Sequence, residues 1–545
     1  MLSPHFRFIK WTLLMLVLFS GFTLPLFTQA LSWEELHQQA VSLYQSGKYP
    51  QAHNVAQQAW KMAQNTFAPE DSRNADSLVI LGSIERVLGL YDRAENDFQS
   101  ALIIREKTLG PENFNCVECL INLAEMEVHQ EAYEKAAYYG ERALNIARKA
   151  LAADNPTLGE ILILMAEIDA GLGKFQEAET ICESGLTLLK NTHGKNHPLT
   201  ARALIVAAQI KYGQGREGKP DLTDARKILG KYNKGKSVWL GAALFLEGKM
   251  NLDKGNYRGA LSCYKQAQSV WEGALSPNHP LAGKAISGLA NVYRLQKNYS
   301  KALSLYQKAH KIWEKAFGLE HPFLAGVLYQ EAEMQYYQAM EFQAGLLYHR
   351  SLLLWEKLSG PENLGMAARL TRLAGIYQIH GQYQEAQPLC DQAIDILNSI
   401  SRPTDPELGI ARSLRGRIYL ELGDFGEAAA EIEAALKIFQ DSYPGGGLEI
   451  TECMLNQARL YALLGRYEEA GNLYEKHFDT LEKALSPNHL YLAMILEDRA
   501  ALALKLGQTE EAKKLQQRAR TIRAKKQAQI LFNFSQKVNL DAVTP

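Results

Sequence analysis

The sequence has little proline and almost no net charge. Its 545 residues include 18 prolines, and 59 Lys and Arg against 60 Asp and Glu give a formal net charge of −1 at pH 7. Proline is disfavoured inside a helix, so its scarcity permits long helices almost throughout the chain. The lack of a basic excess argues against a protein that coats nucleic acid. A hydrophobic content of 47% excludes wholesale disorder.

The sequence also lacks strong catalytic motifs. It contains no P-loop, Gly-x-Ser-x-Gly elbow or His-Glu-x-x-His motif. Residues 213–218 spell Gly-x-Gly-x-x-Gly, but a dinucleotide fingerprint needs a preceding strand, and this copy is expected to join two helices. His193 and His197 have a spacing that suits a metal only on a helix face, and they lie before Pro198 in an expected loop. We therefore expect no enzyme activity, cofactor or metal.

The first thirty residues have the three parts of a secretory signal. Arg7 and Lys10 precede an apolar run over residues 11–27, and residues 28–30 (Thr-Gln-Ala) offer a small-residue cleavage site. The alternative is an uncleaved signal anchor, since about 17–18 apolar residues is close to the lower limit for crossing a bilayer. Both interpretations place the remaining chain outside the cytoplasm, either secreted or periplasmic, or anchored by residues 11–27.

The rest of the chain is one repeat with a period of 42 residues. A phrase of the form Gly-x-(Tyr/Phe)-x-x-Ala has its clearest copies at Gly47, Gly89, Gly173, Gly255, Gly381, Gly423 and Gly465. Seven residues before each turn position stands Ala or Gly, from Ala40 to Ala500, and the gap departs from 42 only between Ala208 and Gly248, where it is 40. This register predicts twelve repeats and leaves no room for another globular domain.

Each repeat is predicted to form two helices. Apolar residues recur at helical spacing on both sides of the turn glycine, and that glycine ends the first helix in a left-handed turn. A single hairpin cannot bury its apolar faces, so neighbouring hairpins must stack. The predicted fold class is all-α, with about twelve helix-turn-helix repeats. The predicted divisions are a signal at 1–30, repeats 1–5 at 33–212, an irregular part of repeat 5 at 213–240, repeats 6–12 with a C-terminal capping helix at 241–534, and a tail at 535–545.

The repeats resemble the tetratricopeptide repeat (TPR), and most closely the 42-residue repeats of the kinesin light chain type. Segments that carry the resemblance are residues 101–113, residues 289–293 and the His-Pro turns at 197–198, 279–280 and 321–322. The hexapeptide Ala-Leu-Ser-Pro-Asn-His at 274–279 recurs at 484–489, which is five periods later. The resemblance implies a right-handed α-α superhelix whose concave groove binds other proteins. It is specific for the fold and not for the function.

Three further features have a structural explanation and a functional alternative. Repeat 5 carries a longer turn and a shorter second helix, which predicts a hinge or, equally, a plain surface insertion. The six cysteines recur at equivalent positions, which favours small core side chains over disulfides, and Cys116 and Cys119 would share one helix, where disulfide geometry is poor. Seven bases in residues 512–530 favour a solvated capping helix over a contact with an anionic membrane or nucleic acid.

The resemblance also implies which residues line the groove. They are first-helix positions 2, 5, 9 and 12, counting the small residue as 8. Position 2 gives an acidic row in repeats 1–4, and position 5 gives an aliphatic strip beside it. The candidate groove residues are Glu34, Asp76, Glu118, Glu160, Glu125, Glu167, Val79, Ile121, Ile163, Ile205, Phe245, Lys249, Asn291, Arg294, Tyr329, Tyr336, Tyr337, Arg417 and Arg459.

The function predicted from these residues is that of a non-enzymatic scaffold outside the cytoplasm. Repeats 1–4 would bind a basic peptide or helix with an apolar anchor, and the tyrosine-rich centre would form a second contact. A merely solvated acidic face is the alternative for the row. The alternative function is an assembly or secretion factor of the cell envelope, held at the membrane by its N-terminus.

Overall fold

The computed structural model describes residues 31–541 except 233–236, 361–362, 401–403 and 443–446, with side chains described as far as residue 528. These residues form 24 helices and contain no strand, which confirms the predicted all-α class. The predicted signal, residues 1–30, lies outside the described part of the chain. No helix within the described part is long and apolar enough to cross a membrane.

The helices form twelve consecutive pairs, here called repeats 1 to 12. The first helices of the pairs are α2 (Trp33–Gln45), α4 (Ser72–Leu88), α6 (Cys116–His129), α8 (Pro156–Gly171), α10 (Pro198–Gly213), α12 (Val238–Asp253), α14 (Pro280–Leu295), α16 (Pro322–Tyr337), α18 (Leu364–Ile379), α20 (Pro406–Leu422), α22 (Leu448–Leu463) and α24 (Leu490–Lys505). The second helices are α3 (Tyr49–Thr66), α5 (Tyr91–Leu109), α7 (Tyr133–Ala150), α9 (Phe175–His193), α11 (Lys219–Leu229), α13 (Tyr257–Ala274), α15 (Tyr299–Phe317), α17 (Glu341–Ser359), α19 (Tyr383–Ile400), α21 (Phe425–Ser442), α23 (Tyr467–Ala484) and α25 (Thr509–Asp541).

The turn inside each pair requires a left-handed backbone residue. Glycine occupies this position in most repeats, for example Gly89 with φ 80° and Gly173 with φ 78°. Where glycine is missing, Glu131, Lys297 and Ala339 adopt the same conformation, with φ values of 63°, 59° and 61°. A residue with a Cβ is strained there by about 1–2 kcal/mol, so the geometry of the turn is imposed by the packing of the two helices.

Histidines cap several first helices. The Nδ1 atom of His197, His279, His321 or His489 accepts a hydrogen bond from the backbone N–H two residues on, at 3.1–3.3 Å. This bond satisfies one of the free donors at a helix N-terminus. The His-Pro turns of the sequence are therefore helix starts, with proline at the first helical position, where its missing N–H costs nothing.

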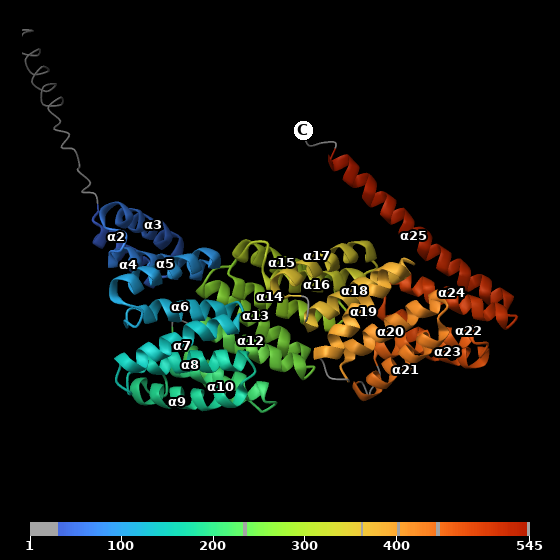
Figure 1. Ribbon diagram of the computed structural model, residues 1–545, viewed down its shortest axis with the longest axis horizontal. Helices are drawn as coiled ribbons and strands as arrows, with labels where there is room; N and C mark the ends of the chain where they lie inside the picture. The colour runs from blue at the N-terminus through green and yellow to red at the C-terminus, as the bar shows by residue number, and fades with distance from the viewer. Residues whose placement is uncertain (1–30, 233–236, 361–362, 401–403, 443–446, 542–545) are drawn as a thin grey trace, which may run out of the picture.

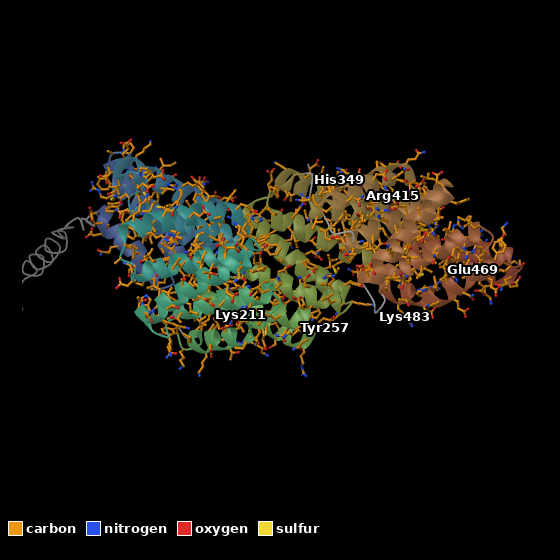
Figure 2. The ribbon with its side chains drawn as sticks, turned by 60° about the horizontal axis from the view of Figure 1, so that its bottom comes forward. Lys211, Tyr257, His349, Arg415, Glu469 and Lys483 are labelled. Atoms are coloured by element: carbon orange, nitrogen blue, oxygen red, sulfur yellow. The ribbon has the colours of Figure 1, made fainter. Side chains whose placement is uncertain are left out.

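The first helices form an inner layer and the second helices an outer one. Ten of the sixteen residues of α14 are buried, against five of the eighteen residues of α13. A first helix packs against its own partner and against the first helices of neighbouring repeats, whereas a second helix leaves one face to solvent. Figure 2 shows that outer surface, with His349 of α17 and with Glu469 and Lys483 of α23 among the labelled side chains.

The superhelix closes onto itself where repeats 7 and 8 rest on repeats 2 and 3. We call this the first axial contact. His279 Nε2 lies 3.2 Å from the carbonyl oxygen of Arg86, and the ring of Tyr91 contacts His279 and Phe317 with centroid distances of 5.9 and 5.3 Å. A Cβ on Gly89 would lie only 2.7 Å from Pro280. One hydrophobic cluster runs through both groups of repeats.

A second axial contact joins repeat 8 to repeat 12. Glu341, which is 2% exposed, accepts a hydrogen bond from the backbone N–H of Leu490 at 2.9 Å and pairs with Lys526 at 2.8 Å. His489 stands over Tyr336 with a centroid distance of 4.4 Å. The chain therefore makes two superhelical turns along its long axis (Figure 1). Repeats that are five apart in the chain meet at the first contact, and repeats that are four apart meet at the second.

Two other parts of the fold bear on the expectations from sequence. The shortest described helix is α11, in repeat 5. Of residues 213–218, Gly213 ends α10 and the other five form the turn between the two helices. Helix α25 extends to Asp541, seven residues into the predicted tail, and leaves the body of the molecule (Figure 1). Residues 530–534 belong to that outgoing helix. All six cysteines are buried and free.

Candidate binding cavities inside the superhelix

The inner side of the first superhelical turn encloses a cavity of about 590 Å³, here called the first-turn cavity. Repeats 1 to 7 all contribute to its wall, from Tyr44 in α2 to Lys284 in α14. Its aromatic lining consists of Tyr44, Tyr49, Tyr91, Tyr133, Tyr212, Trp239, Phe245 and Trp271. The first axial contact closes this turn. The concave groove expected from the sequence is therefore a cavity surrounded by a ring of helices.

The charges of the first-turn cavity are mostly paired. Arg202 reaches Glu125 at 2.8 Å and Glu167 at 3.6 Å, and Arg86 also pairs with Glu125, at 3.3 Å. Lys284 pairs with Glu131 at 2.8 Å across the first axial contact. Burial raises the pKa of the Glu125 carboxyl, but Arg202 and Arg86 outweigh burial and hold it below its ordinary value. The lining is thus close to electrically neutral and not acidic.

The two histidines in this wall are neutral at physiological pH. Burial lowers the pKa of His129 to about 3, with Arg86 adding to the effect, and burial lowers the pKa of His279 to about 3 as well. His129 Nδ1 lies 3.2 Å from the hydroxyl of Tyr91. Lys249 is exposed, with its ammonium 5.6 Å from the centre of the Tyr212 ring. It can therefore meet a ligand that enters the cavity.

The second superhelical turn encloses a smaller cavity of about 100 Å³, the second-turn cavity. Four acidic residues lie in or beside it: Glu333, Glu407, Glu449 and Glu452. Arg372 pairs with Glu333 at 3.1 Å and donates to the hydroxyl of Tyr329 at 3.3 Å. Arg417 is buried and pairs with Asp498 at 2.6 Å.

The predicted groove residues separate into these two cavities and their surroundings. Glu125, Glu167, Ile205, Phe245 and Lys249 line the first-turn cavity. Tyr336, Tyr337 and Arg417 line the second-turn cavity. The other candidates do not line either cavity.

The acidic row does not form an unpaired acidic surface. Asp76 and Glu118 both pair with Arg105 of α5, at 3.0 and 3.1 Å. Glu34 is exposed at the start of α2, and Glu160 is partly buried with a pKa that burial raises. Position 2 of repeat 5 is itself a base, Arg202, which ends the row and neutralises part of it.

The aliphatic strip is not exposed. Val79, Ile163 and Ile205 are 7%, 1% and 7% exposed, and Ile121 is half-buried against the core. The strip therefore does not provide an exposed aliphatic side of the groove beside the acids. These side chains pack between neighbouring first helices, because each inner helix is covered on two sides.

The remaining candidates make local contacts. Asn291 accepts a hydrogen bond from Tyr306 at 2.7 Å, and Arg294 lies beside the same tyrosine. Tyr329 contacts Tyr348 with a centroid distance of 5.6 Å. Arg459 pairs with Asp498 at 3.2 Å.

Several lining residues escaped prediction from the sequence, although the repeat register holds the signal for them. Arg202, Lys284 and Glu452 occupy position 2 of repeats 5, 7 and 11, and Glu333 occupies position 9 of repeat 8. The same positions that gave the acidic row would have found them. Arg86 occupies position 12 of repeat 2, so the register holds a signal for it as well. Tyr91 carries no such signal, because it lies in the second helix α5.

The weak motifs of the sequence have structural places. His197 caps α10, and its ring stacks on His193 with a centroid distance of 4.4 Å. Among the described residues no group of three or more His, Cys, Asp or Glu side chains could hold a metal ion. In the basic C-terminal run, Arg523 pairs with Glu497 of its own repeat at 2.6 Å, and Lys526 pairs with Glu341 of repeat 8 at 2.8 Å.

Comparison with protein families assigns the repeats. The model of the tetratricopeptide repeat matches residues 73–149, 157–219, 239–315, 281–344, 365–441 and 450–525, and a second tetratricopeptide-repeat model matches residues 413–479. These ranges cover well over half of the chain. The chain belongs to the tetratricopeptide-repeat family. The resemblance seen in the sequence is thereby confirmed for the TPR fold.

Three solved structures are similar to parts of the chain. BtubC (BKLC) from P. vanneervenii is 21% identical, covers 45% of this chain and 93% of its own, and has a TM-score of 0.36. A putative kinesin light chain from Podosopora anserina is 21% identical over 37% of this chain and 95% of its own, with a TM-score of 0.32. A Rap protein complexed with competence and sporulation factor is 15% identical over 68% and 99%, with a TM-score of 0.44. No curated protein matches this TPR chain significantly.

Proposed function

We propose that this TPR chain is a non-enzymatic scaffold that binds a peptide segment of a partner protein in the first-turn cavity. The observation that carries the proposal is the cavity itself, about 590 Å³ in volume and lined by aromatic side chains from several repeats. Sites for small ligands and short peptides occupy roughly 300–1,000 Å³ and combine apolar walls with a few polar groups. TPR arrays in general mediate contacts between proteins, which favours a peptide as the ligand.

The lining also indicates the chemistry of the peptide. The paired acids leave little negative charge inside the cavity, so we expect an aromatic or aliphatic side chain as the anchor. A basic flank of the same partner would contact the acidic row, in which Glu34 and Glu118 are exposed. This modifies the ligand expected from the sequence. The apolar anchor occupies the cavity, and the basic part lies outside it.

The test is a binding measurement with matched variants. Cross-linking in native cells identifies the partner, and a synthetic peptide of the cross-linked segment is titrated by calorimetry. Trp239→Ala, which removes an aromatic wall of the cavity, should weaken binding by about tenfold or more, as for a hot-spot residue. Tyr138→Ala is the control, because Tyr138 is 59% exposed on α7 and does not line the cavity. Equal affinity of both variants for the peptide would refute the proposed site.

We also propose that the scaffold works outside the cytoplasm. Support comes from the signal-like residues 1–30, with their basic start and apolar run. Mass spectrometry of the N-terminus of the native protein distinguishes the two forms. A chain that starts at Leu31 is released, whereas a chain that retains Met1 in the membrane fraction is an anchored envelope factor. Recovery of the intact chain in the cytoplasmic fraction alone would refute export.

A further inference from the structure

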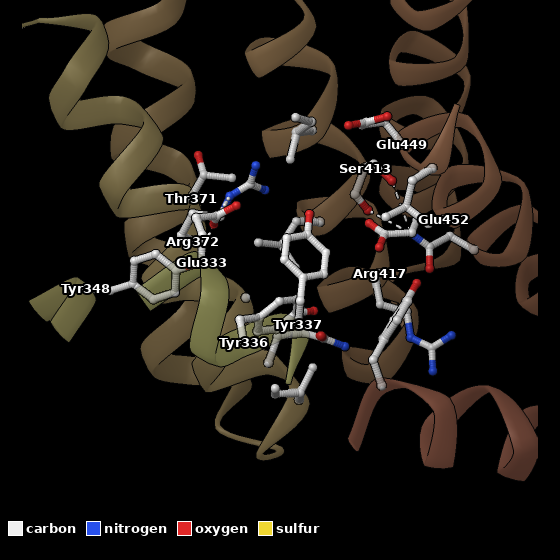
Figure 3. Close-up of a pocket in the computed structure, with 18 of the residues that line it drawn as sticks. Glu333, Tyr336, Tyr337, Tyr348, Thr371, Arg372, Ser413, Arg417, Glu449 and Glu452 are labelled. Atoms are coloured by element: carbon white, nitrogen blue, oxygen red, sulfur yellow. Dashed lines mark hydrogen bonds and ion pairs between the residues drawn. The ribbon is translucent and has the colours of Figure 1, made fainter. Parts of the chain in front are cut away.

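On one side of the second-turn cavity, acidic side chains outnumber basic ones. The charges of Glu333 and Glu449 act on both Glu407 and Glu452, and Arg372 is the base that opposes them at both carboxyl groups. Figure 3 shows Arg372 beside Glu333, with Glu449 and Glu452 across the cavity from that pair. One guanidinium cannot neutralise four carboxylates. A second positive charge at the centre of this group would be stabilised.

Buried polar atoms in the same wall lack partners. Gln378 is 2% exposed and Asn456 is 4% exposed, and both line the cavity. Within the described residues, the Nε2 atom of Gln378 and the Oδ1 atom of Asn456 have no hydrogen-bond partner. Buried polar groups are rarely left unpaired, since the lost hydration is not recovered. A ligand with hydrogen-bond donors would satisfy the Oδ1 atom of Asn456 directly. Rotating the side-chain amide of Gln378 by about 180° would present its oxygen to the same ligand.

The rest of the wall suits an organic cation better than a metal ion. Tyr336, Tyr337, Tyr491 and Phe439 line the cavity, and aromatic faces attract ammonium and guanidinium groups. The described carboxylates do not converge closely enough to coordinate a metal. The volume of about 100 Å³ exceeds the roughly 10–15 Å³ that one water molecule requires, so it admits a head group with a short stem.

The protonation of Glu452 supports the same view. Burial raises its pKa to about 7, and Glu449 and Glu333 add to the effect while Arg372 opposes it. The tyrosines that face it from α16 and α24, Tyr336 and Tyr491, are uncharged at this pH. The empty cavity therefore retains a proton near neutral pH that a bound cation would displace.

We propose that the second-turn cavity binds one alkylguanidinium or alkylammonium group, held between Glu452, Asn456 and the tyrosine walls. The cation donates hydrogen bonds to Glu452 and to the Oδ1 atom of Asn456, and its stem lies along the rings. Glu449 and Glu452 are only partly buried, so the cavity opens to solvent on that side. This site is separate from the first-turn cavity and does not rest on the peptide function proposed for it.

The experiment compares a cation with its neutral isostere. Butylguanidinium, butylammonium and N-butylurea are titrated into the full-length protein by calorimetry at pH 7, in two buffers with different ionisation enthalpies. We expect one of the two cations to bind at one site and to release a fraction of a proton, because the raised pKa of Glu452 lies near the pH of the experiment. N-butylurea should bind at least tenfold more weakly. Failure of both cations to bind at millimolar concentration would overturn the proposal, as would equal binding of the urea.

Matched variants locate the site. Glu452→Gln should lower the affinity for the cation by about tenfold or more and abolish proton release, because it removes the charged acceptor. Glu433→Gln is the control, since Glu433 is exposed on α21 of the same turn. Circular dichroism confirms that both variants are folded, and a second variant, Asn456→Leu, should also weaken binding. Unchanged affinity in Glu452→Gln would refute the assignment.

A further arm identifies where the cation comes from. The capped tripeptide acetyl-Ala-Arg-Ala-amide carries the same guanidinium on a peptide. If the tripeptide binds more tightly than butylguanidinium, the site recognises an arginine side chain of a partner protein. If it binds more weakly, the site takes a free small molecule. Either result supports a cation site, whereas a tripeptide with citrulline in place of arginine that binds equally well contradicts it.

Discussion

The two superhelical turns of this TPR chain are closed in different ways. At the first axial contact, aromatic rings and a histidine cap rest on a backbone turn, and its ion pair between Lys284 and Glu131 is half-exposed. At the second, the carboxylate of Glu341 is almost fully buried with Lys526 and a backbone donor. The first turn takes five repeats and leaves about 590 Å³ inside it, and the second takes four and leaves about 100 Å³.

The difference shows that the number of repeats in each superhelical turn is set locally. The two contacts use the same hexapeptide, residues 274–279 in one and 484–489 in the other, so the identical segment does not decide how many repeats complete a turn. The wider turn is the one that contains repeat 5, with its shortened helix α11. Whether that repeat acts as a hinge stays a prediction. The tighter turn brings side chains such as Arg417 and Asp498 across the inside of the superhelix.

The largest effect is expected at the second contact. Glu341→Ala leaves the ammonium of Lys526 buried without its carboxylate and removes the acceptor of the Leu490 N–H. Such a change costs about 3–5 kcal/mol. Urea unfolding should show this loss, and small-angle scattering should show a longer particle if the turn opens. Glu320→Ala is the control, because Glu320 and its partner Lys357 are 59% and 60% exposed, and a loss below about 1 kcal/mol is expected. Equal losses in both variants would contradict the difference in burial.

At the first contact, a pair of glycine variants isolates the steric part. Gly89→Ala strains a left-handed turn and also drives a methyl group into Pro280, at 2.7 Å. Gly173→Ala causes the same strain with nothing within 4 Å. We expect losses of about 1–2 kcal/mol for Gly173→Ala and about 1–3 kcal/mol more for Gly89→Ala. Thermal unfolding measures both. If the two variants lose the same stability, the first axial contact is not formed in solution.

The smallest effect concerns the second-turn cavity and depends on pH. The pKa of Glu452 is raised to about 7 in the fold, so folding takes up a proton between pH 4.5 and 7 and the carboxylate destabilises the fold as pH rises through that window. Glu452→Gln should therefore be more stable than the native chain by about 1–3 kcal/mol at pH 8. The difference should vanish below about pH 4.5. A difference that does not change with pH would mean that Glu452 titrates normally.

The sequence predicted the repeat units well and their long-range arrangement poorly. The turn glycines specify each hairpin because they adopt the left-handed conformation readily. The small residues from Ala40 to Ala500 do so because they lie where two helices meet and leave no room for a larger side chain. Counting positions within the first helix of each repeat placed Glu125, Glu167 and Phe245 correctly on the inner side of the superhelix. It could not show that Arg86 and Tyr91 meet His279, because the small rotation from repeat to repeat, added over five repeats, decides that contact. It also placed Val79 and Ile163 in the lining of the groove, although two neighbouring helices cover them.

The first axial contact changes how such an array can be made. In an open solenoid each repeat needs only its neighbours, so folding proceeds along the chain as it is synthesised. Here the turn of repeat 2 is completed by His279, which lies 193 residues beyond Arg86 in the chain. The N-terminal repeats therefore wait, with part of the face around Tyr91 and Gly89 uncovered, until more than half of the protein has been translated. A ribosome that pauses before repeat 7 would present this face to chaperones.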